Sequence, residues 1–268
     1  QFLAVMSHEI RTPLNGVLAI ADILERKLAQ PELAPYIHTI QDSGQTLLRL
    51  LTDALDLSRA EAGRLELSEE PFDLPRLLDD VRSLWSARAE EKGLSLAFSY
   101  DGPSDQWALG DAVRIKQVLN NLISNALKFT NSGGIEVALS CVRQDILLGV
   151  VRDTGSGVPP DRLAQIFQPF SQTEDGVRQG GAGLGLSICQ QLVTRMGGGI
   201  EARRNLGQGS TFRFHIPLYD VPPGDSQLTG GEAQADVSPR AFRVLIADDN
   251  ATNRLVAATL CEMFGGEA

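Results

Sequence analysis

A histidine followed directly by a glutamate lies near the N-terminus, within the stretch MSHEIRTPLN at residues 6–15. His8 is one of three histidines among 268 residues. An imidazole exchanges protons near neutral pH, and a neighbouring carboxylate can orient the ring or take its proton. A solvated histidine without a chemical role is the simpler interpretation, and the direction of the side chain decides between the two.

A second group of polar residues lies in NNLISNALKFT at residues 120–130. Asn121, Asn125 and Lys128 are spaced four and three residues apart, so in a helix they share one face. Asparagine is a mediocre helix former, and two of them on one face favour a functional explanation over an ordinary polar surface. Amide oxygens suit a hard cation such as Mg²⁺, and the lysine ammonium suits phosphate.

Two glycine-containing stretches follow along the chain, DTGSGVP at residues 153–159 and GGAGLGLSI at residues 180–188. In the first, the glycines permit a tight turn or the approach of a flat ligand, and Asp153 can accept a hydrogen bond from an amine. In the second, loop amides and a helix N-terminus together form an anion site of the kind that binds phosphate. Either stretch alone is a common turn or loop, so the inference depends on the order of all the motifs.

Together with the His-Glu element, these stretches resemble the core of a sensor histidine kinase of the hybrid type. SHEIRTPLN resembles the phosphoacceptor box, and NLISNALKFT resembles the asparagine box. DTGSGV, FQPFSQ and GAGLGLSI resemble the remaining nucleotide-site boxes, and GQGSTF resembles their usual sequel. The resemblance covers residues 1–218 almost without a gap. VLIADDNATNR is similar to the opening of a receiver domain, whose paired acids hold Mg²⁺.

The resemblance implies a role for each residue of the phosphoacceptor box. His8 would take the γ-phosphoryl group of ATP on a ring nitrogen. Glu9 would orient and deprotonate the imidazole, and Thr12 matches the position associated with dephosphorylating a partner regulator. An exposed imidazole suits this chemistry, because phosphoryl transfer mostly needs in-line positioning and charge neutralisation.

The resemblance also implies a set of nucleotide-binding residues. Asn125 would ligate the Mg²⁺ that bridges the phosphates, Asn121 and Lys128 would stabilise the triphosphate, and Asp153 would bind the adenine amino group. Gly155 and Gly157 would admit the base, and Phe167 and Phe170 would anchor a lid over the nucleotide. The hinge of this lid and the start of the phosphate-facing helix would be formed by Gly181, Gly183, Leu184 and Gly185. Core packing is the alternative role for the two phenylalanines.

The composition limits the possible partners and compartment. A net charge of −10 argues against a nucleic-acid partner or contact with an anionic membrane. No apolar run approaches a membrane span, and no signal peptide opens the chain. Three distant cysteines without metal-ligand spacing indicate buried thiols in a reducing compartment. We therefore expect a cytoplasmic location, with the sensing module and any membrane anchor of the parent protein outside this chain.

Two amphipathic helices are predicted at residues 1–28 and 32–63. Their apolar positions alternate in steps of three and four: Leu3, Met6, Ile10, Pro13, Val17, Ile20 and Leu24, then Ile37, Ile40, Gly44, Leu47, Leu51, Ala54 and Ser58. One hairpin cannot cover both stripes, so the pattern predicts a homodimeric four-helix bundle through residues 1–63. In this register His8 lies opposite the seam and faces water, while Pro13 should kink its helix.

Mixed helices and strands after residue 64 predict an α/β two-layer sandwich. Asp73 should cap a helix that runs to Gly93. Further strands are expected at residues 94–100, 134–142, 146–153, 199–206 and 210–218, and further helices at residues 112–130, 159–167 and 184–196. The predicted domains are residues 1–65 (dimerisation and phosphoacceptor), 66–219 (ATP-binding), 220–240 (linker) and 241–268 (the truncated start of a doubly wound α/β receiver).

The expected function is ATP-dependent autophosphorylation of His8, followed by relay to an aspartate of a receiver domain in cis or of a separate response regulator, with phosphatase activity also possible. Asp248 and Asp249 cannot complete a phosphorylation site here, because no later aspartate or lysine follows them. An ATPase of the gyrase and heat-shock chaperone type is one alternative, but it leaves the His-Glu helix unexplained. A catalytically silent scaffold is the other, although no key residue is missing.

Overall fold

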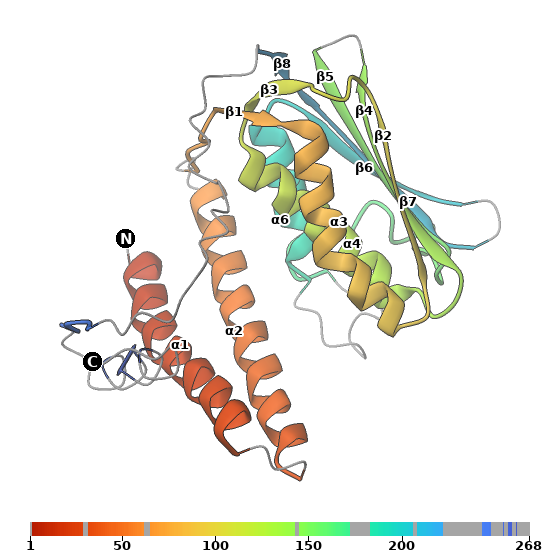
Figure 1. Ribbon diagram of the computed structural model, residues 1–268. Helices are drawn as coiled ribbons and strands as arrows, with labels where there is room; N and C mark the ends of the chain where they lie inside the picture. The colour runs from red at the N-terminus through yellow and green to blue at the C-terminus, as the bar shows by residue number, and fades with distance from the viewer. Residues whose placement is uncertain are drawn as a thin grey trace. The chain divides into compact units, whose positions relative to one another are not determined.

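The computed structural model describes residues 2–28, 32–61, 65–142, 145–171, 183–205, 208–221, 243–247, 254, 257–258 and 261 (Figure 1). Its contacts divide the chain into two compact units. One consists of Gln1–Leu55 with Gln227–Ala268, and the other is Asp56–Ser226. Among the described residues, no helix is both long and apolar enough to cross a membrane.

The N-terminal part is a hairpin of two antiparallel helices, α1 (Phe2–Leu28) and α2 (Ala34–Glu61), as the sequence predicts (Figure 1). The helices approach closely at Gly44, where an added Cβ would lie 2.6 Å from Cδ2 of Leu18. A polar contact also joins them, because Nε2 of Gln41 donates to carboxylates on α1. The hairpin is therefore held by one tight apolar contact and by hydrogen bonds between side chains.

Only part of the apolar surface of the hairpin is buried in a single chain. Ala21 and Ile37 are 2% and 6% exposed, whereas five large apolar side chains remain 37–48% exposed. Those five are Val17, Ile20, Leu24, Ile40 and Leu47. The predicted α1 seam through Val17, Ile20 and Leu24 is thus not the one that packs on α2, since Leu18 and Ala21 take that place. One hairpin buries a single stripe of each helix and leaves the other stripe open.

The second unit contains a five-stranded sheet with the strand order β2-β4-β5-β7-β6. Its strands are β2 (Ser95–Asp101), β4 (Gly134–Val142), β5 (Ile146–Asp153), β6 (Gly199–Arg204) and β7 (Ser210–Pro217). β2 and β4 are parallel, and the other neighbouring pairs are antiparallel. Alternate side chains of β7 are buried, which is the pattern of a sheet with one covered face.

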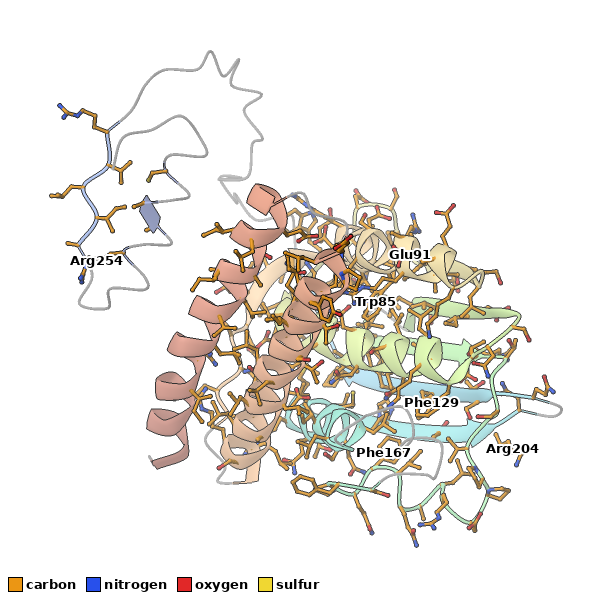
Figure 2. The ribbon with its side chains drawn as sticks, turned by 90° about the horizontal axis from the view of Figure 1, so that it is seen from below. Trp85, Glu91, Phe129, Phe167, Arg204 and Arg254 are labelled. Carbon is orange, nitrogen blue, oxygen red and sulfur yellow. The ribbon has the colours of Figure 1, made fainter. Side chains whose placement is uncertain are left out.

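Three helices cover one face of this sheet: α3 (Leu74–Glu91), α4 (Ala112–Phe129) and α6 (Gly185–Arg195) (Figure 1). The side chain of Asp73 accepts a hydrogen bond from the amide of Arg76 and caps α3, as predicted. Trp85 of α3 (Figure 2) donates from Nε1 to Oδ1 of Asn120 at 2.8 Å, which ties α3 to α4. The predicted two-layer α/β sandwich is confirmed.

A small second sheet was not predicted as such, although the stretch RLELSEEPFDL at residues 64–74 suggests a strand and a turn. It consists of β1 (Glu70–Asp73), β3 (Trp107–Gly110) and β8 (Tyr219–Asp220), in the order β1-β3-β8. Gln106 connects the two sheets, since it accepts a hydrogen bond from Tyr100 at 2.6 Å and donates one to Asp220 at 2.7 Å. Strands of two to four residues are too short for an alternating pattern to reveal.

The predicted helix at residues 159–167 is wrong. Successive turns replace it, with the amide of Arg162 donating to the carbonyl of Pro159 and that of Gln165 to the carbonyl of Arg162. Pro160 and Pro169 bound this stretch. Proline lacks a backbone donor and restricts the residue before it, so a regular helix has too little room between them.

Within the described residues after 240, namely 243–247, 254, 257–258 and 261, the predicted receiver-like fold is not observed. Residues 244–247 form no strand, and Leu245 is 96% exposed. Asp248 and Asp249 lie outside the described residues. A strand of this apolar kind needs neighbours in a sheet to satisfy its backbone, and residues 244–247 belong to neither sheet of the described part of the chain.

Candidate functional site

Helix α4 has an apolar face in the core and a polar face beside the turn and loop motifs. Its buried residues include Ile115, Leu119 and Leu122, which have no exposed surface. Asn121, Asn125 and Lys128 are half-buried on the polar side of the helix. The observed helix therefore carries the two amides and the ammonium along one face, as the spacing predicts.

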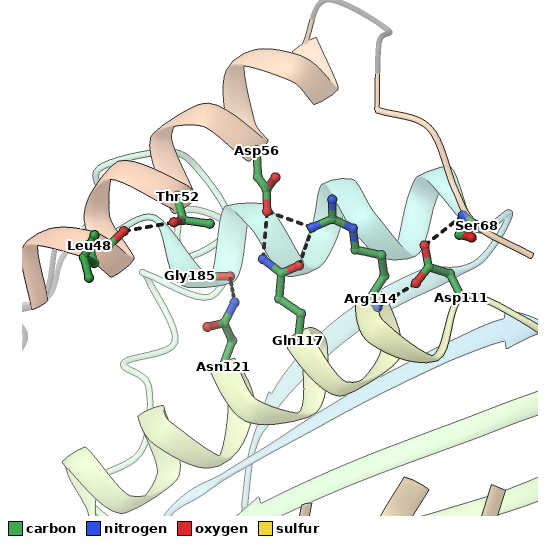
Figure 3. A network of polar contacts seen from close by, with 9 residues as sticks. All are labelled: Leu48, Thr52, Asp56, Ser68, Asp111, Arg114, Gln117, Asn121 and Gly185. Atoms are coloured by element: carbon green, nitrogen blue, oxygen red, sulfur yellow. Dashed lines mark hydrogen bonds and ion pairs between the residues drawn. The ribbon is translucent and has the colours of Figure 1, made fainter. Parts of the chain in front are cut away.

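The polar face of α4 meets the N-terminus of α6. Nδ2 of Asn121 donates to the carbonyl of Gly185 at 3.4 Å (Figure 3). Leu184 occupies the N-cap position of α6 and makes no side-chain capping hydrogen bond. The first amides of α6 are consequently available for an anion, because a helix start has four donors without intrahelical partners.

Asp153 ends strand β5 as a buried carboxylate, 5% exposed. Its Oδ1 accepts hydrogen bonds from the amides of Gly155 at 2.9 Å and Ser210 at 3.2 Å. Burial raises the pKa of Asp153, and these two hydrogen bonds oppose the rise. The described residues offer no hydrogen-bond donor to Oδ2, which is thus an acceptor that a ligand amine can use.

The loop after Asp153 requires glycine at two positions. At Gly155, an added Cβ would collide with the carbonyl oxygen of Phe129 at the end of α4. Gly157 has a φ of +73°, and its Cβ would lie 2.8 Å from the carbonyl oxygen of Gly209. The loop is therefore packed between the end of α4 and the start of β7, which brings Asp153 close to the helix that carries the asparagines.

Phe170 and Gly183 join the two ends of the glycine-rich segment. The amide of Phe170 donates to the carbonyl of Gly183 at 3.0 Å, and both residues have positive φ, 60° and 71°. Phe170 is 69% exposed, so the alternative of core packing does not apply to it. Phe167 (Figure 2) does pack against the core, as that alternative states. Gly181 lies outside the described residues.

The phosphoacceptor residues are described only by their backbone. His8, Glu9 and Thr12 lie within α1. The directions of their side chains, and the predicted exposure of the imidazole, lie outside what the structure describes. The helix itself runs without interruption through Pro13.

Sequence reasoning missed the contribution of β7 to the site. The amide of Ser210 holds the carboxylate of Asp153, and its hydroxyl accepts a hydrogen bond from the amide of Val158 at 2.8 Å. Gly209 has a φ of +87° and lies against the backbone of Asp153. The stretch GQGSTF was the available signal, but the sequence alone does not show that it contacts the Asp-Gly turn.

The assembled groups suit a purine nucleoside triphosphate. A buried carboxylate can accept from an aromatic amine, the glycine loop leaves room for a flat base, and the amide face with the helix N-terminus can bind phosphates. Within the described residues, no three His, Cys, Asp or Glu side chains form a metal cluster. The amide oxygen of Asn125 fits a Mg²⁺ ion that takes its other ligands from phosphate and water.

Two family descriptions match the chain. Residues 1–63 match the His Kinase A (phospho-acceptor) domain. Residues 110–220 match the histidine kinase-, DNA gyrase B- and HSP90-like ATPase.

Similar proteins cover nearly the whole chain. The autoinducer 2 sensor kinase/phosphatase LuxQ of Vibrio cholerae is 35% identical over 99% of this chain and 32% of its own length. The crystal structure of full-length ShkA in complex with AMPPNP matches with a TM-score of 0.69 and 38% identity, over 99% of this chain and 54% of that chain. The histidine kinase ThkA, in its complex with the response regulator protein TrrA, matches with a TM-score of 0.53 and 29% identity, over 80% of this chain and 60% of that chain. This chain spans about a third of the length of the curated relatives it matches.

Proposed function

Because this chain belongs to the sensor histidine kinases, we propose that it transfers the γ-phosphoryl group of ATP to a ring nitrogen of His8. The observation that carries the proposal is the buried carboxylate of Asp153, whose Oδ2 is open beside a glycine loop and the polar face of α4. This arrangement supplies an acceptor for the adenine amino group. The same chain carries the His-Glu pair on α1.

In the proposed reaction, a nitrogen–phosphorus bond forms at His8 and the bond from the γ-phosphorus to the bridging oxygen of ATP breaks. ADP leaves, and Glu9 takes the imidazole proton. Asn121 and Lys128 hold the triphosphate, and Asn125 ligates Mg²⁺. The ion, when bound, neutralises phosphate charge. Phe170 anchors the lid that encloses the nucleotide, and Gly183 and Gly185 form its hinge and the start of α6.

The second step of the proposal is relay to an aspartate of a receiver domain. A phosphoramidate on histidine keeps a high transfer potential, so the group can pass onward to a carboxylate. The acceptor is a receiver in cis or a separate response regulator, and the complex of ThkA with the regulator TrrA supports such a partner. Thr12 is assigned to the reverse role, dephosphorylation of the regulator, and LuxQ is a relative named as both kinase and phosphatase.

We also propose that two chains pair through residues 1–63 into a four-helix bundle. The exposed side chains of Val17, Ile20, Leu24, Ile40 and Leu47 form a stripe on each helix that a second hairpin would cover. Such an extent of exposed apolar surface marks an interface. The phosphoacceptor domain match over the same residues supports the pairing.

The remaining assignments concern the organisation of the chain. Residues 1–65 form the phosphoacceptor domain, 66–219 the ATP-binding domain, 220–240 a linker and 241–268 the beginning of a receiver. Relatives align with 99% of the chain, which supports a receiver start as the identity of the last part. Because ATP is the substrate, the chain works in the cytoplasm, whether or not the parent protein is anchored in a membrane.

Incubation with γ-labelled ATP tests the proposal. The protein should acquire label that is acid-labile and base-stable, and His8→Ala should abolish it without changing nucleotide affinity. The other two histidines supply matched controls, because His38→Ala and His215→Ala should both be labelled normally. Undiminished label on His8→Ala would exclude His8 as the acceptor. Nucleotide binding without any label on the parent would favour the silent scaffold.

A further inference from the structure

The C-terminal end of α2 is held on the ATP-binding unit by a partly buried polar triad. Oδ2 of Asp56 accepts hydrogen bonds from Nη1 of Arg114 at 2.9 Å and Nε2 of Gln117 at 3.0 Å (Figure 3). Nη1 of Arg114 also donates to Oε1 of Gln117 at 2.7 Å, which closes the triad. The Asp56 side chain is 7% exposed and that of Arg114 is 22% exposed.

A second contact holds the same stretch of α2. Nη2 of Arg195, in the last turn of α6, donates to the carbonyl of Ala60 at 3.2 Å. Leu57 and Ala60 are 8% and 7% exposed and belong to the core cluster of the ATP-binding unit. The compact unit correspondingly begins at Asp56, within α2, rather than after that helix.

The two helices that hold α2 also form the proposed nucleotide site. On α4, Arg114 and Gln117 precede Asn121 by seven and four residues, so the triad and the nucleotide residues occupy successive turns of one polar face. On α6, Gly185 lies at the N-terminal end and Arg195 at the C-terminal end. The site of chemistry and the attachment of α2 are therefore built on the same rigid elements.

The attachment restricts where the ATP-binding domain can pivot. Helix α2 is continuous from Ala34 to Glu61. While the triad is closed, residues 56–61 of α2 move with the domain, so the pivot cannot lie within this stretch of the helix. Phosphoryl transfer to His8 requires the domain to reach α1, and such a movement can set the rate of an enzyme. Opening of the triad would free residues 56–61 to move relative to the domain.

We propose that Asp56, Arg114 and Gln117 are positioning residues that form a releasable clamp, which restrains the ATP-binding domain and limits the rate of autophosphorylation. The inference rests on the proposed kinase function. A buried ion pair is a poor means of permanent attachment, since well-packed apolar residues often stabilise a junction at least as well. It suits a contact that must form in one geometry and open again, and opening also separates Leu57 and Ala60 of α2 from the core cluster and breaks the hydrogen bond from Arg195 to Ala60.

Charge variants of the full chain test the clamp. Asp56→Ala and Arg114→Ala should raise the autophosphorylation rate at saturating Mg²⁺-ATP by about tenfold or more, because each removes a hydrogen bond to a charged group. The KM for ATP should not change, since neither residue belongs to the nucleotide site. Gln117→Met, which keeps the size of the side chain and removes its polar contacts, is a milder variant and should give a smaller increase in the same direction.

A charge swap separates a clamp from a merely structural role. The double variant Asp56→Arg with Arg114→Asp should return toward the parental rate, because the amide of Gln117 can both donate and accept. The matched control is Lys116→Ala, which breaks the ion pair of Lys116 with Asp80 on α3 and should leave the rate unchanged. The proposal would be overturned by a parental or lower rate in both single alanine variants. It would also be overturned if these variants raised the rate and the charge swap raised it equally.

Hydrogen exchange at residues 56–61 reports clamp opening without relying on the kinase reaction. Faster exchange is expected in Asp56→Ala and Arg114→Ala, and parental exchange in the charge swap and in Lys116→Ala. Unchanged exchange in the alanine variants would refute the clamp whatever the enzymatic rates. Absence of label from the parent and all variants, together with these exchange differences, would refute the proposed kinase function and leave the physical clamp supported.

Discussion

Replacement of Asp153 by asparagine should separate nucleotide binding from the folding of its loop. The asparagine amide can direct its oxygen at the amides of Gly155 and Ser210, which now donate to Oδ1 of the carboxylate. Its Nδ2 then takes the place of Oδ2 and presents hydrogens to the adenine amino group. Two donors would face each other across the site, so ATP should bind more weakly although the loop keeps its fold. Asp153→Ala, in contrast, should lose both nucleotide binding and the folded conformation of the loop.

The size of the effect follows from the single acceptor that is lost. A hydrogen bond to a charged group contributes about 1.5–3 kcal/mol, so ATP affinity should fall about 10–150-fold. At a ligand concentration of about 100 times Kd, binding stabilises the parent by about 2.7 kcal/mol. That corresponds to a rise in Tm of roughly 5–10 °C for a domain of 150–250 residues. After a hundredfold loss of affinity, the same ligand concentration should raise the Tm by only about 1 °C.

The same variant should be more stable than the parent when no nucleotide is bound. Burial raises the pKa of Asp153 above its ordinary value of 3.8. Between that value and the raised pKa, the folded protein holds a proton that the unfolded chain has released. The free energy of unfolding therefore falls as the pH rises through this window and stays lowered at neutral pH. Asparagine does not titrate, so this loss of stability should be absent.

Thermal unfolding with and without ATP, measured at pH 7 and at pH 4, checks all three expectations. ATP should raise the Tm of the parent more than that of Asp153→Asn. In the absence of ligand at pH 7, the variant should have the higher Tm. The difference between the two ligand-free proteins should shrink at pH 4. A full ATP-induced rise in Tm for Asp153→Asn would refute the assignment of Oδ2 to the adenine amine.

Three further perturbations test the other parts of the proposal. Asn125→Ala should weaken ATP binding about tenfold or more in Mg²⁺ and much less in its absence, and titration calorimetry showing equal losses would contradict the role of the metal. Leu47→Asp should yield monomers by light scattering, because this side chain is 44% exposed on the hairpin, whereas Leu84→Asp, at an exposed leucine of α3, should not. A chain that ends at Val221 should autophosphorylate normally, but one that ends at Leu218 loses β8 and the Gln106–Asp220 hydrogen bond and should be destabilised by about 1–3 kcal/mol in urea.

The sequence predicted the long elements, and it placed the polar residues of the candidate site on one face of α4 and at the end of β5. Helices with a 3.6-residue period, such as α4, were found because their apolar face must be buried. The strands β4 and β5 were found for the corresponding reason. The roles of Asp153 and its glycines were implied only by the resemblance, because such a turn after a strand is common and the contacts that require glycine, with Phe129 and Gly209, come from distant segments.

The sequence did not predict features that depend on contacts between distant segments. Asp56 lies 58 residues from Arg114, and neither belongs to a motif that would mark it as a partner. Ser210 lies 57 residues from Asp153, and only the completed sheet brings its amide to the carboxylate. The stretch at residues 159–167 has an apolar spacing that resembles a helix, but the prolines around it decide the backbone.

The burial of α4 determines from which side the clamp can be regulated. Ile115, Val118 and Leu119 have no exposed surface, and α6 is anchored in the same core by Ile188 and Val193. A close-packed interior does not allow either helix to slide by a fraction of a turn when phosphates bind at their other ends. Arg114 and Gln117 are therefore carried by a helix that is fixed in the core. A bend or rotation of α2 can open the triad, because Asp56 lies on that helix. This is why the clamp variants should change the rate of transfer and not the affinity for ATP.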